Sequence, residues 1–179
     1  RKPLIAAVHG YCLGLGLELA LECDLMVASE DTLFGEPEIK LAEPFGFIRL
    51  PKLIGEKKAM LISLTGDFID AKEAERLGMV SLVVPTEKLD QTVMELAEKL
   101  KEKSALALWF TKLGIKHCPE VDRATAHVLE SLLEAITIGG PDMEEAVKAF
   151  KEKRKPVLTY KLPQTAWWNR YKEFIGKAQ

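Results

Sequence analysis

The sequence predicts an α/β fold in which a strand–helix–strand core, residues 1–86, precedes a run of helices. Two short apolar segments, Leu4–Val8 and Leu25–Ala28, have the length and composition of buried strands. A glycine-rich turn and the helical segment Leu15–Cys23 separate them. A strand, a helix and a strand within about 30 residues form a βαβ unit, which implies a parallel strand pair covered by helices.

The rest of the core continues as short elements separated by proline and glycine. Residues 36–54 are expected to be loop and short helix, because Pro37, Pro44 and Pro51 interrupt them. Phe45 and Phe47 in this stretch are expected to fill the core, and the alternative is that they narrow or shape a binding pocket. The further elements predicted are a strand over Thr32–Gly35, a helix over Lys57–Leu64 ending near Gly66, a helix over Ala71–Leu77 capped by Asp70, and a strand over Val80–Val84.

From residue 87 onward the apolar residues recur at helical spacing. The segments predicted to be helical are Glu87–Lys103, Ser104–Lys116, 119–138 and Met143–Lys153, with Asp142 as the N-cap of the last. We therefore expect a helical oligomerisation region over residues 87–158, because its amphipathic faces need a surface to pack against. A C-terminal amphipathic tail is expected over residues 159–179.

Composition excludes several classes of function. The chain has 179 residues, 25 basic and 27 acidic side chains and a net charge of −2, which argues against nucleic acid as a partner. Three scattered cysteines and three histidines predict neither a disulfide framework nor a metal site, and they favour a reducing, cytoplasmic location. The apolar run 3–28 is not expected to enter a membrane, because Glu18, Glu22 and Asp24 interrupt it.

Two glutamates stand out as candidate catalytic residues. Glu18 lies in the first turn of the predicted helix, inside an apolar, glycine-rich run, and Glu38 follows Pro37 in a loop. Two carboxylates facing one pocket can share acid and base work if their pKa values differ. The turn Gly14-Leu15-Gly16 offers backbone N–H groups at a helix N-terminus, which suit a developing oxyanion. The alternatives are that Glu18 only complements the helix dipole and that the glycines only form a tight turn.

The segment KPLIAAVHGYCLGLGLELALECDLMVASEDTLFGEPEI resembles the signature of the crotonase (enoyl-CoA hydratase/isomerase) superfamily. Two later stretches, LTGDFIDAKEAERLGMVSLVVP and AFKEKRKP, resemble further blocks of that family, so the resemblance covers residues 1–158. It implies the C-terminal portion of a crotonase-like ββα spiral core, followed by a helical trimerisation region. It also implies an acyl-CoA substrate, no separate cofactor, and a homotrimer or dimer of trimers.

The resemblance assigns roles to individual residues. Glu18 corresponds to the base that activates water and Glu38 to the acid that protonates the α-carbon of a 2-enoyl-CoA. The backbone N–H of Leu15, between Gly14 and Gly16, corresponds to one donor of the oxyanion hole. The second donor belongs to a segment that precedes Arg1. Since the chain also starts without methionine, we expect it to be N-terminally incomplete.

One departure from the family pattern keeps other activities open. Hydratases usually have a glycine-rich loop after the Pro-Glu pair, whereas this chain reads IKLAEPFGFIRLPKLIG. The predicted reaction is hydration of a 2-enoyl-CoA to a 3-hydroxyacyl-CoA. The alternatives are an enoyl-CoA isomerase or acyl-CoA hydrolase on the same fold, or a non-catalytic crotonase-like module of a larger chain.

Overall fold

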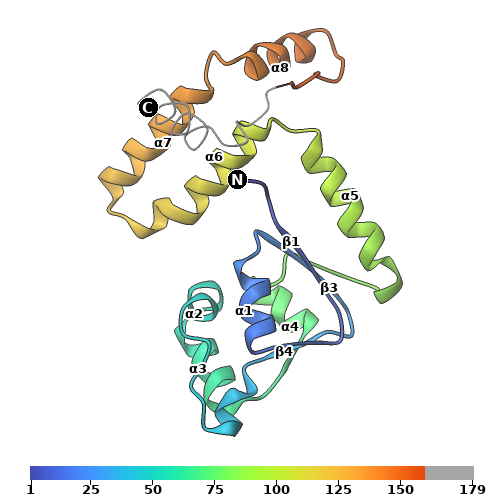
Figure 1. Cartoon of the computed structure of the whole chain (residues 1–179), viewed down its shortest axis with the longest axis vertical. Coiled ribbons are helices and arrows are strands. Elements are labelled where there is room, and N and C mark those ends of the chain that lie inside the picture. The colour runs from blue at the N-terminus through green and yellow to red at the C-terminus, as the bar shows by residue number, and fades with distance from the viewer. Residues whose placement is uncertain (160–179) are drawn as a thin grey trace, which may run out of the picture. The chain divides into compact units, whose positions relative to one another are not determined.

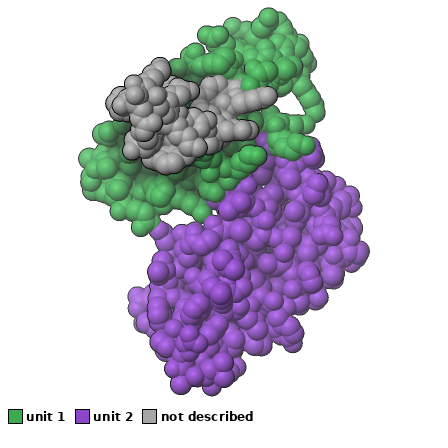
Figure 2. Space-filling view, in the orientation of Figure 1, with its two compact units in different colours: residues 1–2, 101–179 green, residues 3–100 purple. Residues whose placement is uncertain are grey.

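The computed structural model describes residues 1–159 (Figure 1). The chain divides into two compact units, coloured separately in Figure 2: unit 2 comprises residues 3–100, and unit 1 comprises residues 1–2 and those from 101 onward. Helix α5 (Leu89–Lys101) falls in unit 2 up to Leu100. Each unit is described by itself.

Unit 2 contains two small sheets, with strand orders β1-β3-β6 and β2-β4-β5. The strands are β1 (Ile5–Val8), β2 (Tyr11–Leu13), β3 (Leu25–Ser29), β4 (Leu33–Gly35), β5 (Ile69–Asp70) and β6 (Leu82–Val84). Strand β3 is parallel to both β1 and β6, β2 is parallel to β4, and β5 is antiparallel to β4. The predicted parallel pair is therefore confirmed, with Ile5 opposite Leu25.

Helices connect and cover these strands. They are α1 (Leu15–Glu22), η1 (Pro37–Leu41), α2 (Arg49–Ile54), α3 (Glu56–Thr65), α4 (Ala71–Arg76), η2 (Thr86–Lys88) and α5. Two predicted helix boundaries are confirmed by their local chemistry. Asp70 caps α4, because its carboxylate accepts a 2.8 Å hydrogen bond from the N–H of Glu73. Helix α3 ends at Gly66, whose φ of 66° is the left-handed conformation that favours glycine.

Strand β2 was not predicted, because the glycines on both sides of Tyr11–Leu13 favour a turn. Gly10, with φ 65°, separates β1 from β2, so consecutive strands enter different sheets. The Gly10 carbonyl accepts a 2.7 Å hydrogen bond from the N–H of Leu33, at the start of β4. The strand therefore depends on a partner some twenty residues away, which a local sequence pattern does not reveal.

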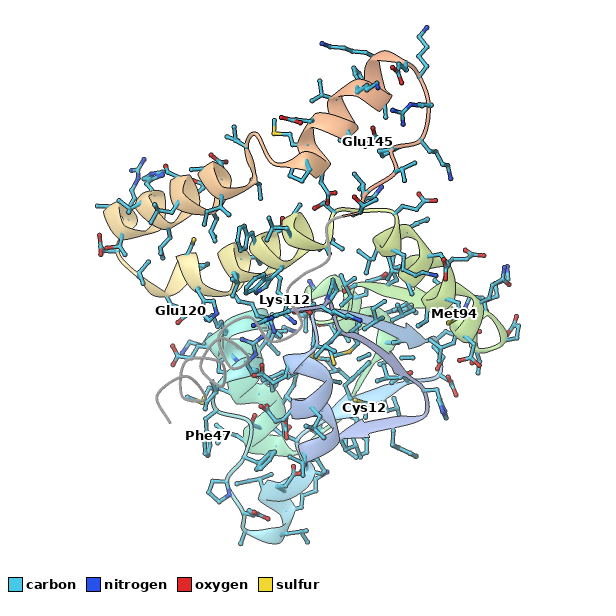
Figure 3. The ribbon with its side chains drawn as sticks, turned by 45° about the horizontal axis from the view of Figure 1, so that its top comes forward. Cys12, Phe47, Met94, Lys112, Glu120 and Glu145 are labelled. Atoms are coloured by element: carbon cyan, nitrogen blue, oxygen red, sulfur yellow. The ribbon has the colours of Figure 1, made fainter. Side chains whose placement is uncertain are left out.

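The core of unit 2 lies where α1 meets the sheets and α2. Leu17, Phe34 and Leu50 are almost fully buried there, together with Cys12, which is labelled in Figure 3. Burying a side chain of the size of Phe34 contributes about 1.5–3 kcal/mol. Phe47, also labelled in Figure 3, is 68% exposed, so the prediction that it fills the core is wrong.

Unit 1 is helical over its described residues. Its helices are α6 (Ala105–His117), η3 (Cys118–Glu120), α7 (Arg123–Thr137) and α8 (Pro141–Lys151). Asp122 caps α7 by accepting hydrogen bonds from the N–H groups of Ala124 and Thr125.

The prediction that Asp142 caps the last helix is wrong. Helix α8 starts one residue earlier, with Gly140 as N-cap and Pro141 at the first position, where its fixed φ suits a helix. Asp142 lies in the first turn and accepts a 3.2 Å hydrogen bond from the N–H of Thr159. None of the helices within residues 1–159 is long and apolar enough to span a bilayer. The predicted C-terminal tail lies, beyond Thr159, outside the described residues.

Candidate active site

The turn at Gly14 connects the end of β2 to the start of α1. Gly14 has φ 51°, and its N–H donates a 3.0 Å hydrogen bond to the carbonyl of Gly35, the last residue of β4. Its own carbonyl accepts a 2.9 Å hydrogen bond from the N–H of Glu18. The hydrogen bond to Gly35 holds the turn to the sheet with strand order β2-β4-β5. The N–H of Leu15, at the first position of α1, is left to point out of the helix N-terminus, where the backbone dipole favours negative charge.

Glu38 reaches this turn from η1. A Cβ atom built on Gly14 would lie 1.6 Å from Oε1 of Glu38 and 2.7 Å from its carboxyl carbon. The carboxyl group of Glu38 therefore lies directly against the Cα of Gly14, in space that any other residue at position 14 would occupy. The structure thus brings Glu38 to the start of the helix that carries Glu18.

Glu18 is half-buried in the first turn of α1. Burial raises the pKa of its carboxyl group, and the negative charge of Glu22 raises it further, while Arg49 lowers it. Arg49 itself pairs with Glu22, with 3.0 Å between its Nε and Oε1 of Glu22. Oε1 of Glu18 is buried and meets no hydrogen-bond partner in the described part of the chain. Such a carboxylate is poised to take up a proton.

A third acid, Glu36, which was not among the predicted site residues, completes the cluster. Its side chain is 1% exposed, and neither carboxyl oxygen meets a hydrogen-bond donor among residues 1–159. Burial, then the negative charges of Glu38 and Glu18, raise the pKa of Glu36 to about 8. The signal that could have found it is an acidic residue directly after a buried strand.

The cluster combines three carboxyl groups with a backbone N–H donor. Glu18 and Glu36 both have raised pKa values. The carboxyl group of Glu38 lies against Gly14, at the N-terminus of α1. Groups of this kind can remove a proton from one atom and supply one to another. Within residues 1–159, no group of His, Cys, Asp and Glu is arranged to hold a metal ion.

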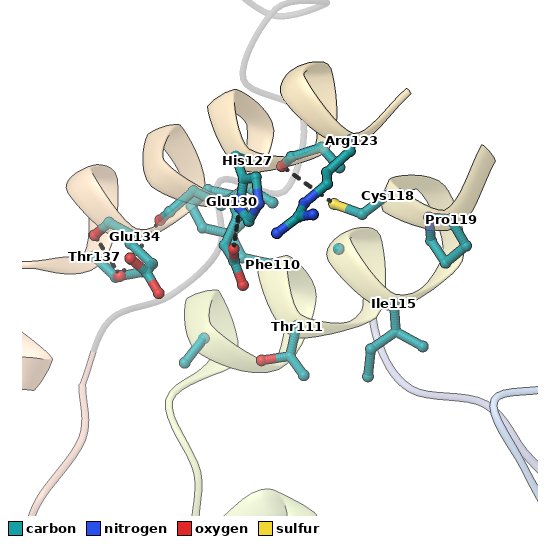
Figure 4. A pocket seen from close by; sticks show the side chains of 14 residues that line it. Phe110, Thr111, Ile115, Cys118, Pro119, Arg123, His127, Glu130, Glu134 and Thr137 are labelled. Atoms are coloured by element: carbon teal, nitrogen blue, oxygen red, sulfur yellow. Dashed lines mark hydrogen bonds and ion pairs between the residues drawn. The ribbon is translucent and has the colours of Figure 1, made fainter. Parts of the chain in front are cut away.

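A separate pocket lies between α6 and α7 in unit 1. Its volume is about 700 Å³, and its lining includes Phe110, Ile115 and Thr137 (Figure 4). His127 and Glu130, at its rim, are 3.6 Å apart between Nδ1 and Oε2. None of the predicted site residues lines this pocket, so it is separate from the carboxyl cluster.

Comparisons with known proteins bear on the whole of this arrangement. A family model described as "Enoyl-CoA hydratase/isomerase" matches residues 1–161. A probable mitochondrial enoyl-CoA hydratase of Dictyostelium discoideum is 42% identical over 87% of this chain and 57% of its own length. A 2,3-dehydroadipyl-CoA hydratase of Escherichia coli is 39% identical over 87% of this chain and 62% of its own length. The chain therefore spans about 60% of these relatives.

Solved structures agree with the sequence relatives. An enoyl-CoA hydratase from Mycobacterium tuberculosis superimposes with a TM-score of 0.85 at 37% identity, over 88% of this chain and 64% of the other. An enoyl-CoA hydratase from Bacillus anthracis gives a TM-score of 0.84 at 38% identity, over 87% of this chain and 62% of the other. The fold is thus the α/β crotonase-like fold that the resemblance implied. The chain belongs to the enoyl-CoA hydratase/isomerase family, within the crotonase superfamily.

Proposed function

We propose that the protein carrying this sequence catalyses the reversible hydration of a 2-enoyl-CoA to a 3-hydroxyacyl-CoA. The observation that carries the proposal is the position of Glu38 against Gly14, at the start of the helix that bears Glu18. Two carboxyl groups and a free backbone N–H then meet at one turn. The proposal is also supported by relatives described as hydratases of CoA thioesters.

In the proposed reaction, Glu18 acts as base and Glu38 as acid. Glu18 takes a proton from water as the water oxygen forms a bond to the β-carbon. The electron pair of the double bond moves onto the thioester oxygen, where the Leu15 N–H donates a hydrogen bond to the enolate. Glu38 then gives its proton to the α-carbon. The sum is one water added across the double bond, and solvent returns the proton from Glu18 to Glu38.

The substrate is proposed to be an acyl-CoA thioester, with a chain that the loop after Glu38 helps to select. Leu41, Phe47 and Ile48 in this loop are 81%, 68% and 77% exposed. Apolar side chains exposed this close to the carboxyl cluster can contact an acyl chain. The relative from Escherichia coli is named for a dicarboxylic acyl group, so both apolar and carboxyl-terminated chains belong in a substrate screen.

The assembly is proposed to be a homotrimer or a dimer of trimers, formed through unit 1. Val128, Leu132 and Ile136 are more than half exposed along one face of α7, and Phe150 on α8 is 85% exposed. Exposed apolar faces of this length are typical of interfaces between subunits. A cytoplasmic location stays a prediction, since two similar relatives are described as mitochondrial.

The proposed function is tested by replacing each glutamate by its neutral isostere in the full chain. We expect Glu18→Gln and Glu38→Gln each to lower kcat for crotonyl-CoA hydration by about 10²–10⁴. Glu30→Gln, at an exposed position outside the cluster, is the matched control and should retain activity.

The other outcomes identify the alternatives. Hydration that survives the loss of either glutamate would contradict the two-carboxylate mechanism. Double-bond migration or release of free CoA, without hydration, would indicate an isomerase or a hydrolase. Binding of acyl-CoA with no turnover would indicate a non-catalytic module.

A further inference from the structure

The carboxyl group of Glu36 is buried where, among the described residues, no hydrogen-bond donor stabilises a negative charge. The side chain is 1% exposed, and both carboxyl oxygens lie buried without a hydrogen-bond donor in the described part of the chain. Leaving a charged group buried and unpaired is among the most costly arrangements in a protein interior. The proposed hydration does not require this residue, so its burial calls for a different explanation.

The groups that face Glu36 make the ionised form still less favourable. Glu38 from η1 and Glu18 from α1 are both acids and both act on it. Cys12 from β2 is also near, and its own pKa is raised to about 11 by burial first and then by Glu36. Arg49 does not offset this charge, because it acts on Glu18 and pairs with Glu22.

Among residues 1–159, the side chain best placed to exchange a hydrogen bond with Glu36 carries another carboxyl group. The Glu38 carboxyl group is near enough to act on that of Glu36, and two carboxyl groups can form a hydrogen bond only if one of them carries a proton. The loop residue Gly46, with φ 81°, closes over the same side chain. A Cβ built there would lie 3.0 Å from Cγ of Glu36, and the loop thereby restricts access of water.

We propose that Glu36 carries a proton at neutral pH and donates it in a hydrogen bond to the Glu38 carboxyl group, which makes Glu36 a positioning residue for Glu38. The inference rests on the proposed hydratase function. In that reaction Glu38 becomes negatively charged when it gives its proton to the α-carbon. A neutral donor beside it stabilises that charge and holds the carboxyl against Gly14.

If Glu36 acts in this way, activity should fall at alkaline pH. As the pH rises through the pKa of Glu36, which is about 8, the donor is lost and a second negative charge appears beside Glu38. Glu38 then gives up its proton less readily, and the rate falls. An amide at position 36 could still donate a hydrogen bond but could not ionise.

The test compares Glu36→Gln and Glu36→Leu with the unmodified full chain in crotonyl-CoA hydration across this pH range. We expect kcat of the unmodified chain to fall above pH about 8. We expect Glu36→Gln to stay within about threefold of it at neutral pH and to lose this alkaline decline. Glu36→Leu should lower kcat by about tenfold or more with little change in KM. An alkaline decline that persists in Glu36→Gln would overturn the proposal, as would full kcat in Glu36→Leu.

Infrared difference spectra give a second readout that does not depend on turnover. Spectra taken on either side of the pKa should show loss of a protonated carboxyl band in the unmodified chain, and this band should be absent in Glu36→Gln but present in the control Glu30→Gln. The infrared measurement also tests whether Glu36 carries a proton if Glu36→Leu fails to fold. A missing band overturns the role of Glu36 whatever the activity. A band in a chain that does not hydrate crotonyl-CoA contradicts the proposed function and still assigns the proton to Glu36.

Discussion

The two units use apolar residues in different ways. In unit 2, side chains from both sheets and from α1 to α4 are buried in a common interior, with Phe34, Leu17 and Leu50 almost inaccessible to solvent. In the described part of unit 1, the buried apolar residue is Ala149, while Leu132 and Phe150 remain exposed. Unit 2 therefore has its own core and holds the carboxyl cluster. The helices of unit 1 have apolar faces that a further surface must cover.

The largest effect expected from this difference concerns the core. Phe34→Ala should lower the free energy of unfolding by about 3–5 kcal/mol, because it leaves a cavity in a fully packed site. Phe150→Ala, with the same change of side chain at a position 85% exposed, should lower it by less than about 0.5 kcal/mol in the dissociated chain. Urea titrations of the two variants measure this. Equal losses would show that unit 1 is packed as closely as unit 2.

The next effect concerns the site that the core supports. Gly14→Ala should reduce kcat for enoyl-CoA hydration by about 10² or more, because the new methyl group would overlap the Glu38 carboxyl. Gly10→Ala is the matched control: Gly10 also has a positive φ, of 65°, but no atom lies within 4 Å of a Cβ built there. We expect Gly10→Ala to cost about 1 kcal/mol of stability and to leave kcat unchanged. Similar activity losses in both variants would point to backbone strain, not to the position of Glu38.

A change on the exposed face of α7 tests the role of unit 1. Leu132→Lys should shift the assembly toward monomers, because a charge would enter the proposed interface between subunits. Leu61→Lys on α3 changes an equally apolar residue, 58% exposed against 56% for Leu132, and should leave the assembly intact. Analytical ultracentrifugation distinguishes the two results. An unchanged mass for Leu132→Lys would place the interface elsewhere.

The smallest effects are expected from ion pairs, which both units carry on exposed surface. The pKa of Glu73 in unit 2 is lowered from 4.5 to about 2 by Arg76 first and then by Lys58. The pKa of Glu145 in unit 1 is lowered to about 2 by Arg154 first and then by the N–H of Val157. Both carboxylates therefore stabilise the folded chain above pH 4.5. This stabilisation is lost as the pH falls toward about 2.

Melting temperatures measured as a function of pH test this pair of contributions. Glu73→Gln and Glu145→Gln should each melt slightly below the unmodified chain at neutral pH, and the differences should shrink in acid and in high salt. A deficit that grows in acid would contradict the assignment. A much larger deficit for Glu145→Gln would mean that unit 1 depends on its ion pair more than unit 2 does.

Much of unit 2 could be predicted because its signals are local. The apolar strands β1 and β3, the cap at Asp70 and the stop at Gly66 each follow from a few neighbouring residues. Strand β2 could not be predicted, because Tyr11–Leu13 pairs with a strand distant in sequence. Helix α8 begins before the predicted cap, since a proline at the first helical position outweighs the side chain of the residue after it.

The candidate site was predictable only through its motif. Glu18 and the glycine turn lie together on one element, whereas the approach of Glu38 to Gly14 depends on how the loop after β4 folds back. Glu36 was missed because an acidic residue in a loop is ordinarily exposed, and only the packing of the second sheet and of Gly46 shows that it is buried. The catalytic roles of Glu18 and Glu38 stay predictions.

The closure of Gly46 over Glu36 makes the length of the connecting segment as important as its composition. A typical surface loop tolerates added residues, since each doubling of its length costs only about 0.6 kcal/mol in closure entropy. In the segment between Glu36 and Gly46, an added residue would move the glycine away and let water hydrate the carboxyl beneath it. Hydration would favour the ionised form of Glu36. An insertion in this loop could therefore change the charge of the cluster without altering any of its three acids.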